Sequence, residues 1–357
     1  MGYGITSQIT FEQKNKSTII KRAITMLSFE GIYADAAILT FGMQFVGFAV
    51  AAILQTEVFY DVLGGINFLA LAVFSFLEGL DKNGSNAVSN DKVGASFNIN
   101  NGVFAAFFAL SRGWLLVFLA WRAHHRKGDS RFDGVRTVPS KFFVYWMVQA
   151  IWVYCISLPL LAVAANETAA ADADAATASD QDLNDVDLLR SLLLLGMAFS
   201  IFVEIWSDIV KAGWVARGRP GGFCRDGLWK HSRHPNYAGE ISTWVFAAVY
   251  ATCVCDWSWT VATIASISPV FTVQILLNTS GTGVWNAEGK NLKRYYENEN
   301  QTVAKNYEEY RETTPPLFPT FFVPYETIPL EYQRRFCFEW ERYEFKKSSK
   351  GKHNKQE

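Results

Sequence analysis

The sequence is poor in cysteine, and its five cysteines follow no ordered spacing. The closest pair, Cys253 and Cys255, stands inside an apolar run with a single residue between them. Zinc sites and disulfide-rich domains require more cysteines at fixed separations. We therefore expect no disulfide framework and no metal site, and we interpret the cysteines as small packing residues of apolar helices.

A strong net charge and a Rossmann fingerprint are also missing. The formal net charge is −1, which by itself points to no particular partner. No Gly-x-Gly-x-x-Gly follows a β-strand pattern, and the glycine-rich stretch 218–222 lacks that context. A Rossmann-type nucleotide site is therefore excluded. We expect no nucleic acid as a partner and, given the apolar blocks described next, membrane lipids.

What the sequence has is long apolar blocks. Half of the residues are hydrophobic, yet mean hydropathy is only +0.07 because charged loops and a charged tail dilute the blocks. The blocks are continuous and roughly 20 residues long, the length that an α-helix needs to cross a bilayer core of about 30 Å. The sequence predicts an all-α, multi-pass membrane helix bundle. We expect about seven transmembrane helices, at 36–54, 62–80, 102–121, 142–165, 188–210, 241–255 and 257–277.

The charged loops predict the orientation. Basic residues gather in 122–141 and 211–240, whereas 166–187 carries acidic residues and neither Lys nor Arg. Under the positive-inside rule the basic loops and the C-terminal tail are cytosolic, and the acidic loop is luminal or exterior. In a eukaryotic cell we expect the endoplasmic reticulum.

The segment after the last span is more polar than the rest of the chain. Residues 285–311 are typical of one polar helix, so the predicted cytosolic tail is helical. Aromatic residues alternate with charges from Phe336 to Phe345, as expected for a segment at the level of the lipid headgroups. The predicted organisation is an N-terminal extension 1–35, N-terminal spans 36–101, a membrane domain 102–320 and an aromatic tail 321–357.

Polar residues of one predicted span form a stripe. Glu204, Asp208 and Lys211 are spaced i, i+4 and i+7, so they lie on one face of a helix. Carboxylates in a spanning helix are costly to insert and usually face a protein interior. A structural ion pair and a functional cavity both explain the stripe.

The loop that follows this span carries the densest set of candidate residues. Pro235 can begin the next helix, which places Arg233 and His234 at its N-terminal end. Free backbone N–H groups there favour phosphate, so the loop is a candidate nucleotide site. On composition alone, a solvated positive loop is the more frequent explanation.

The same loop carries a family resemblance. It reads Ser232-Arg233-His234-Pro235-Asn236-Tyr237, followed by Gly239-Glu240. This resembles the signature of the steroid 5-alpha-reductase C-terminal domain, above all in a poorly characterised membrane branch, and is similar to sterol C14-reductases and isoprenylcysteine carboxyl methyltransferases. Further blocks of that branch stand in order at 128–133, 204–211, 288–290 and 307–319. The resemblance covers about 102–320, with a weaker echo at 61–65.

The resemblance implies a membrane oxidoreductase that uses NADPH to reduce a conjugated carbon–carbon double bond of a lipid or steroid-like substrate. Candidate cofactor contacts are Arg225, Lys230, Arg233, His234, Asn236, Tyr237, Glu288, Lys293, Arg294 and Tyr310. The cations among them could hold the phosphates of NADPH. Tyr237, His234 and Glu240 are the candidate catalytic residues. Two alternatives stay open: a methyltransferase using S-adenosylmethionine, and a non-catalytic lipid-binding membrane protein.

Overall fold

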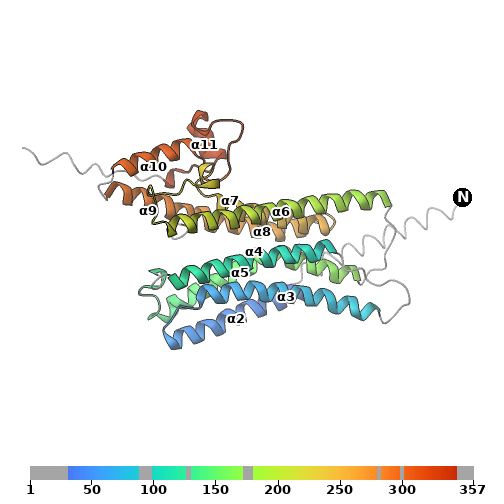
Figure 1. The fold of residues 1–357 in the computed structure, drawn as a ribbon. Coiled ribbons are helices and arrows are strands. Elements are labelled where there is room, and N and C mark those ends of the chain that lie inside the picture. The colour runs from blue at the N-terminus through green and yellow to red at the C-terminus, as the bar shows by residue number, and fades with distance from the viewer. Residues whose placement is uncertain are drawn as a thin grey trace, which may run out of the picture. The chain divides into compact units, whose positions relative to one another are not determined.

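The computed structural model describes residues 31–87, 99–125, 130–171, 180–279, 283–297 and 301–343. Within these ranges every regular element is a helix (Figure 1). The predicted all-α fold class is therefore confirmed. The first predicted domain, 1–35, lies almost wholly outside the described residues.

Six helical stretches are long and apolar enough to cross a membrane, among the residues that the structure describes. Five lie in α2 (Ile32–Leu54), α3 (Tyr60–Ala87), α4 (Ile99–His125), α5 (Pro139–Ala171) and α6 (Asp180–Ala216). The sixth begins with α8 (Trp259–Val273), which continues as a π-helical turn over Gln274–Asn278. The chain is thus a multi-pass membrane protein by the length and composition of its helices.

The predicted count of about seven differs from this by one segment. The expected span 241–255 is the later part of α7 (Pro235–Val254), which begins at Pro235 as predicted. Its first turn carries the polar motif, so the apolar part is too short to qualify by itself.

Several helices also run beyond their apolar blocks: α5 ends at Ala171 and α6 begins at Asp180, so much of the predicted loop 166–187 is helical.

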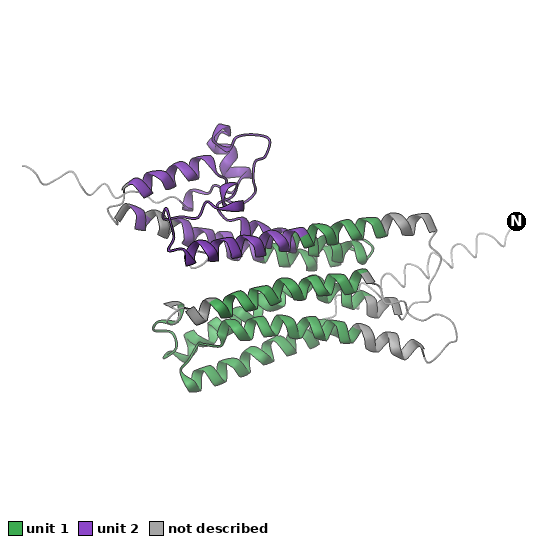
Figure 2. Cartoon of the chain, viewed as in Figure 1, with its two compact units in different colours: residues 1–198, 244–271 green, residues 199–243, 272–357 purple. Residues whose placement is uncertain are grey.

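Contacts divide the chain into two compact units, shown in Figure 2. Unit 1 comprises residues 1–198 and 244–271, and unit 2 comprises residues 199–243 and 272–357. The predicted N-terminal spans 36–101 lie wholly in unit 1, whereas the boundaries between the units all lie inside the predicted membrane domain 102–320. The predicted tail from 321 belongs to unit 2 as far as Tyr343, where the described residues end.

Unit 1 is built on an aromatic core between its first helices. Tyr60, Phe132, Phe142 and Trp146 are buried and pack edge to face. Phe132 belongs to a short 3-10 turn, Ser130–Phe132, and this packing explains why a polar loop carries a buried ring. The loop is fixed further by ion pairs at its ends, Arg131 with Asp61 at 2.8 Å and Arg136 with Glu57 at 3.1 Å.

Unit 2 joins the loop after α6 to short helices from the C-terminal region. The single polar helix expected over 285–311 is two helices, α9 (Gly283–Glu297) and α10 (Gln301–Thr313). The remaining elements are η2 (Gly227–Lys230), η4 (Tyr325–Thr327), α11 (Leu330–Phe336) and η5 (Glu341–Tyr343). Tyr343 is fully buried in a cluster with Leu277 and Leu317, so the aromatic tail forms a protein core at this point.

Glycine lets α6 and α7 approach closely within unit 2. A Cβ built on Gly239 would lie 2.7 Å from the backbone nitrogen of Glu204 and 2.8 Å from the carbonyl oxygen of Ser200. Backbone atoms of a helix cannot move aside as a flexible side chain can. The motif glycine is therefore explained by helix packing, as small residues commonly are in membrane helix pairs.

We expect Gly239→Ala to destabilise the protein by about 1–3 kcal/mol, because the added methyl group overpacks the α6–α7 contact. Gly113→Ala is the matched control: it also lies inside a helix, and a Cβ there meets nothing within 4 Å. Thermal unfolding of both variants in detergent measures the difference. Equal midpoints for the two variants would show that α6 and α7 do not pack this tightly.

Candidate functional site

We call residues 217–234, which connect α6 to α7, the motif loop. Two prolines from the C-terminal region hold its backbone. The N–H of Arg233 donates to the carbonyl of Pro315 and that of His234 to the carbonyl of Pro316, both at 2.9 Å. Proline has a backbone carbonyl but no backbone N–H, so in this contact the prolines only accept hydrogen bonds. The expectation that these two amides are free to bind phosphate at the start of α7 is wrong, because both are already used.

The side chain of Arg233 lies in a buried network of four charges. Its guanidinium pairs with Glu288 at 2.8 Å and with Glu339. Arg311 pairs with the same two glutamates, at 3.2 Å and 2.9 Å. The side chains of Arg233 and Glu288 are 1% and 0% exposed. Burial disfavours the charge of Arg233, but the attraction of the two glutamates outweighs burial and raises its pKa. Two positive and two negative charges therefore compensate one another. We call these four residues the ion network.

His234 extends the ion network toward α7. Its Nε2 lies 3.1 Å from a carboxylate oxygen of Glu288, and its ring stacks on Tyr237 with 5.3 Å between centroids and 4° between planes. Burial lowers the pKa of the imidazole below 6.5, although the bond to Glu288 acts in the opposite direction. At neutral pH His234 is therefore uncharged and its Nε2–H donates to Glu288.

Three buried tyrosine hydroxyls donate hydrogen bonds near the ion network, one of them to the network itself. Tyr310 donates to the carbonyl of Trp229 in the motif loop, Tyr325 donates to Glu339 at 3.0 Å, and Tyr343 donates to the carbonyl of Leu277 at 2.9 Å. Burial raises the pKa of all three tyrosines, so they remain neutral donors at any physiological pH. Tyr310 was expected to contact a cofactor, but its hydroxyl donates to the backbone of the motif loop.

The polar stripe of α6 meets the start of α7 and the motif loop. Glu204 and Asp208 are buried, and the side-chain amide of Asn236 donates to Asp208 at 3.1 Å. The Nζ of Lys211 lies 4.0 Å from the ring centroid of Trp229. The stripe therefore connects α6 to the residues around the motif.

The other predicted cofactor cations lie at the surface of unit 2. Arg225, Lys230, Lys293 and Arg294 are all exposed. Arg225 stands over the ring of Tyr310 at 5.3 Å. Arg294 stands over the ring of Tyr295 at 4.9 Å and donates to its hydroxyl at 3.1 Å. Both tyrosines belong to one buried aromatic cluster, together with Tyr307 and Phe223. The guanidinium groups of Arg225 and Arg294 thus both pack on rings of the same aromatic cluster.

The structure separates the predicted cofactor and catalytic residues into four groups. It brings together Arg233, His234, Glu288 and Tyr310, and it places Asn236 beside Asp208. It leaves four cations exposed: Arg225, Lys230, Lys293 and Arg294. Tyr237 and Glu240 are half-buried at the start of α7.

Sequence reasoning missed Arg311 and Glu339, which complete the ion network, and Tyr325, which donates to Glu339. Arg311 follows Tyr310 directly and lies one turn beyond Tyr307, so the tyrosine pair was a usable signal for it. Nothing distinguishes Glu339 from the other acids that alternate with aromatic residues in the tail.

A family model matches residues 47–314, three quarters of the chain. The chain belongs to DUF1295, a family of proteins of unknown function. No curated protein and no solved structure matches it. The match includes Arg233, Glu288 and Arg311 and ends before Pro315. Glu339, Tyr325 and the two prolines contact the motif loop or the ion network from outside the matched region.

Removing one glutamate of the ion network should leave a buried arginine without full neutralisation of its positive charge. We expect Glu339→Gln to cost about 3–5 kcal/mol of folding free energy. Glu341→Gln is the matched control, because Glu341 is 74% exposed and pairs with the half-exposed Arg334; it should cost less than about 1 kcal/mol. Chemical or thermal unfolding compares them, and an equally small effect of both would show that Glu339 faces water.

The lowered pKa of His234 makes stability depend on pH. The unfolded imidazole binds a proton near pH 6.5 and the folded one only at lower pH, so the contribution of His234 is complete above pH 6.5 and is lost as pH falls below it. Relative to His234→Gln, the wild type should lose up to about 1.4 kcal/mol more per pH unit in that range. Parallel unfolding curves of the two proteins between pH 7.5 and 5.5 would contradict this.

Proposed function

We propose that the chain is a membrane oxidoreductase that reduces a conjugated carbon–carbon double bond of a lipid or steroid-like molecule with NADPH. The resemblance of the Arg233–Tyr237 motif to steroid 5-alpha-reductase-type enzymes motivates the reaction class. The observation that carries the cofactor is the pair of exposed guanidinium groups, Arg225 and Arg294, on one aromatic cluster. Such a surface suits a ligand that combines aromatic rings with phosphates.

The residues present fit NADPH, with a change in the roles first assigned to them. Arg233 is neutralised by Glu288 and Glu339 and is 1% exposed, so it is a poor phosphate ligand. Arg225, Lys230, Lys293 and Arg294 are exposed and would hold the phosphates. NADPH would supply the hydride. Arg233 and His234 would act by fixing the loop that carries Arg225 and Lys230.

The proton that completes a reduction has candidate donors at the start of α7. Tyr237 is half-buried and its ring is held flat against His234. His234 is neutral and is oriented by Glu288. Tyr237 is therefore the candidate general acid, with His234 as its positioning residue and Glu240 one turn further along the helix. An uncharged pair here also avoids placing a second cation beside Arg233.

Binding of nucleotides to the purified protein tests the cofactor. We expect NADPH to raise the unfolding temperature and S-adenosylmethionine, which has no phosphate, to leave it unchanged. Arg225→Ala and Arg294→Ala should each weaken NADPH binding by roughly tenfold or more, since each removes a charge-assisted contact of about 1.5–3 kcal/mol. Arg334→Ala, a surface arginine away from the aromatic cluster, serves as the control and should bind as the wild type does.

Two outcomes would overturn this assignment. Protection by S-adenosylmethionine instead of NADPH would replace the reductase by a methyltransferase. Protection by neither nucleotide, in protein that unfolds cooperatively, would favour a non-catalytic lipid-binding protein.

A further inference from the structure

The segment between α10 and η4 exposes a row of apolar side chains. We call residues 318–323 the aromatic loop. Phe318 and Val323 are partly exposed, Phe321 is 79% exposed and Phe322 is 99% exposed. The loop contains no charged residue. Contiguous exposed apolar side chains of this size usually mark an interaction surface.

Both ends of the aromatic loop are fixed to the ion network. Just before it, Leu317 is fully buried and the carbonyl of Pro316 accepts from His234. Just after it, Tyr325 is buried and donates to Glu339, and Gln333 donates to the carbonyl of Tyr325 at 3.0 Å. The exposed rings are therefore presented on a supported loop. Phe318 also contacts Phe338, with 6.2 Å between ring centroids, whereas Phe321 and Phe322 remain largely exposed.

The helix that follows adds apolar and basic surface. In α11 the exposed rings of Tyr332 and Phe336 stack with 6.1 Å between centroids. Arg335, also exposed, stands over the ring of Phe336 at 5.7 Å. Exposed aromatic rings with adjacent arginines are typical of segments that lie in a membrane interface, where the rings enter the acyl boundary and the cations meet anionic headgroups.

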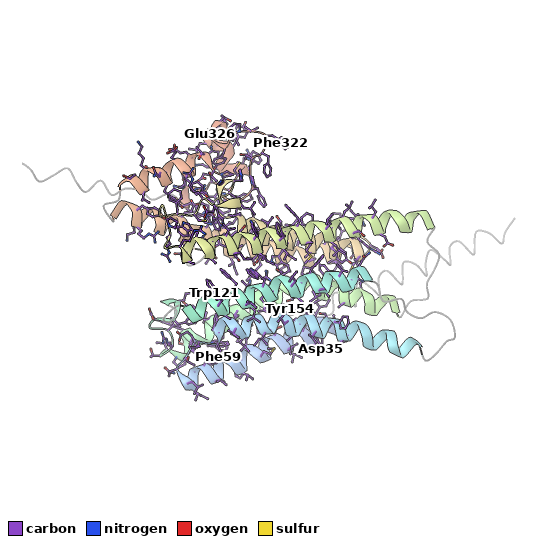
Figure 3. All side chains as sticks on the ribbon, viewed as in Figure 1. Asp35, Phe59, Trp121, Tyr154, Phe322 and Glu326 are labelled. Atoms are coloured by element: carbon purple, nitrogen blue, oxygen red, sulfur yellow. The ribbon has the colours of Figure 1, made fainter. Side chains whose placement is uncertain are left out.

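A bilayer is available to unit 2 without any further partner. Unit 2 contains the second half of α6, which is the end of a candidate membrane span. Phe199, Phe202 and Trp206 of that half are exposed and apolar, as lipid-facing residues are. Figure 3 labels Phe322 and Glu326, which both belong to unit 2.

We propose that the aromatic loop inserts into the headgroup and acyl boundary of the membrane that the chain itself spans. Phe321 and Phe322 are the inserted rings and Arg335 contacts anionic headgroups. The lipid contact of the C-terminal region thus lies at 318–323. The alternating aromatic segment that begins at Phe336 is only partly available for it, because Tyr343 is buried.

Photo-crosslinking in a defined bilayer tests the proposal. The full-length protein is reconstituted into vesicles of phosphatidylcholine and phosphatidylglycerol that contain a clickable phospholipid. Phe322 is replaced by p-benzoylphenylalanine, a close aromatic substitute at a side chain that is almost wholly exposed. Phe202, exposed within the span, is the positive control, and Glu326, exposed four residues beyond Phe322, is the negative control. Unfolding curves identical to the wild type confirm that the replacements leave the fold unchanged.

We expect position 322 to label lipid as position 202 does and severalfold more than position 326. Arg335→Gln should lower labelling at 322 in vesicles rich in phosphatidylglycerol and leave it unchanged in pure phosphatidylcholine. Labelling at 202 with none at 322 would overturn the proposal. A crosslink from 322 to a second copy of the chain, in place of lipid, would overturn it as well. Neither result depends on which nucleotide the protein binds.

Discussion

The cost of an uncompensated charge in a dry interior is the constraint on which unit 2 depends. Arg233 cannot be buried alone, because an unpaired guanidinium in low dielectric is strongly unfavourable. Its burial requires Glu288, and two glutamates around one arginine require a second cation, which Arg311 provides. Four segments far apart in the sequence must therefore meet at one point. The hydroxyl of Tyr325 donates to Glu339, and the carbonyls of Pro315 and Pro316 accept from the backbone of Arg233 and His234.

This arrangement changes what the motif means. An arginine and a histidine before a helix suggest a phosphate site, yet here their charges and amides are directed inward. Under the proposed function, Arg233 and His234 hold the loop in shape, and the exposed Arg225 and Arg294 would meet the ligand. A buried network of paired charges favours one conformation, because a partial rearrangement would leave a charge unpaired.

The sequence was informative where the physics is local or periodic. Continuous apolar blocks predicted the membrane helices, and Pro235 marked the start of α7, because both signals depend on a few neighbouring residues. The polar start of α7 also explains why the expected span 241–255, although helical, is not among the six candidate spans of the described residues. The contact between Arg233 and Glu339 could not be predicted in this way. It depends on two side chains 106 residues apart in a region where acids are common.

That long separation also has a consequence for how the protein is made. The residues that neutralise Arg233 are translated 55 and 106 positions after it, so the nascent chain carries an unmatched charge until Glu339 has left the ribosome. The insertion of the membrane helices can proceed without it, since they are satisfied by their own backbone bonds. Unit 2 therefore completes its fold late in synthesis. A chain that stalled before Glu339 would expose an incompletely folded unit 2 to cellular quality control.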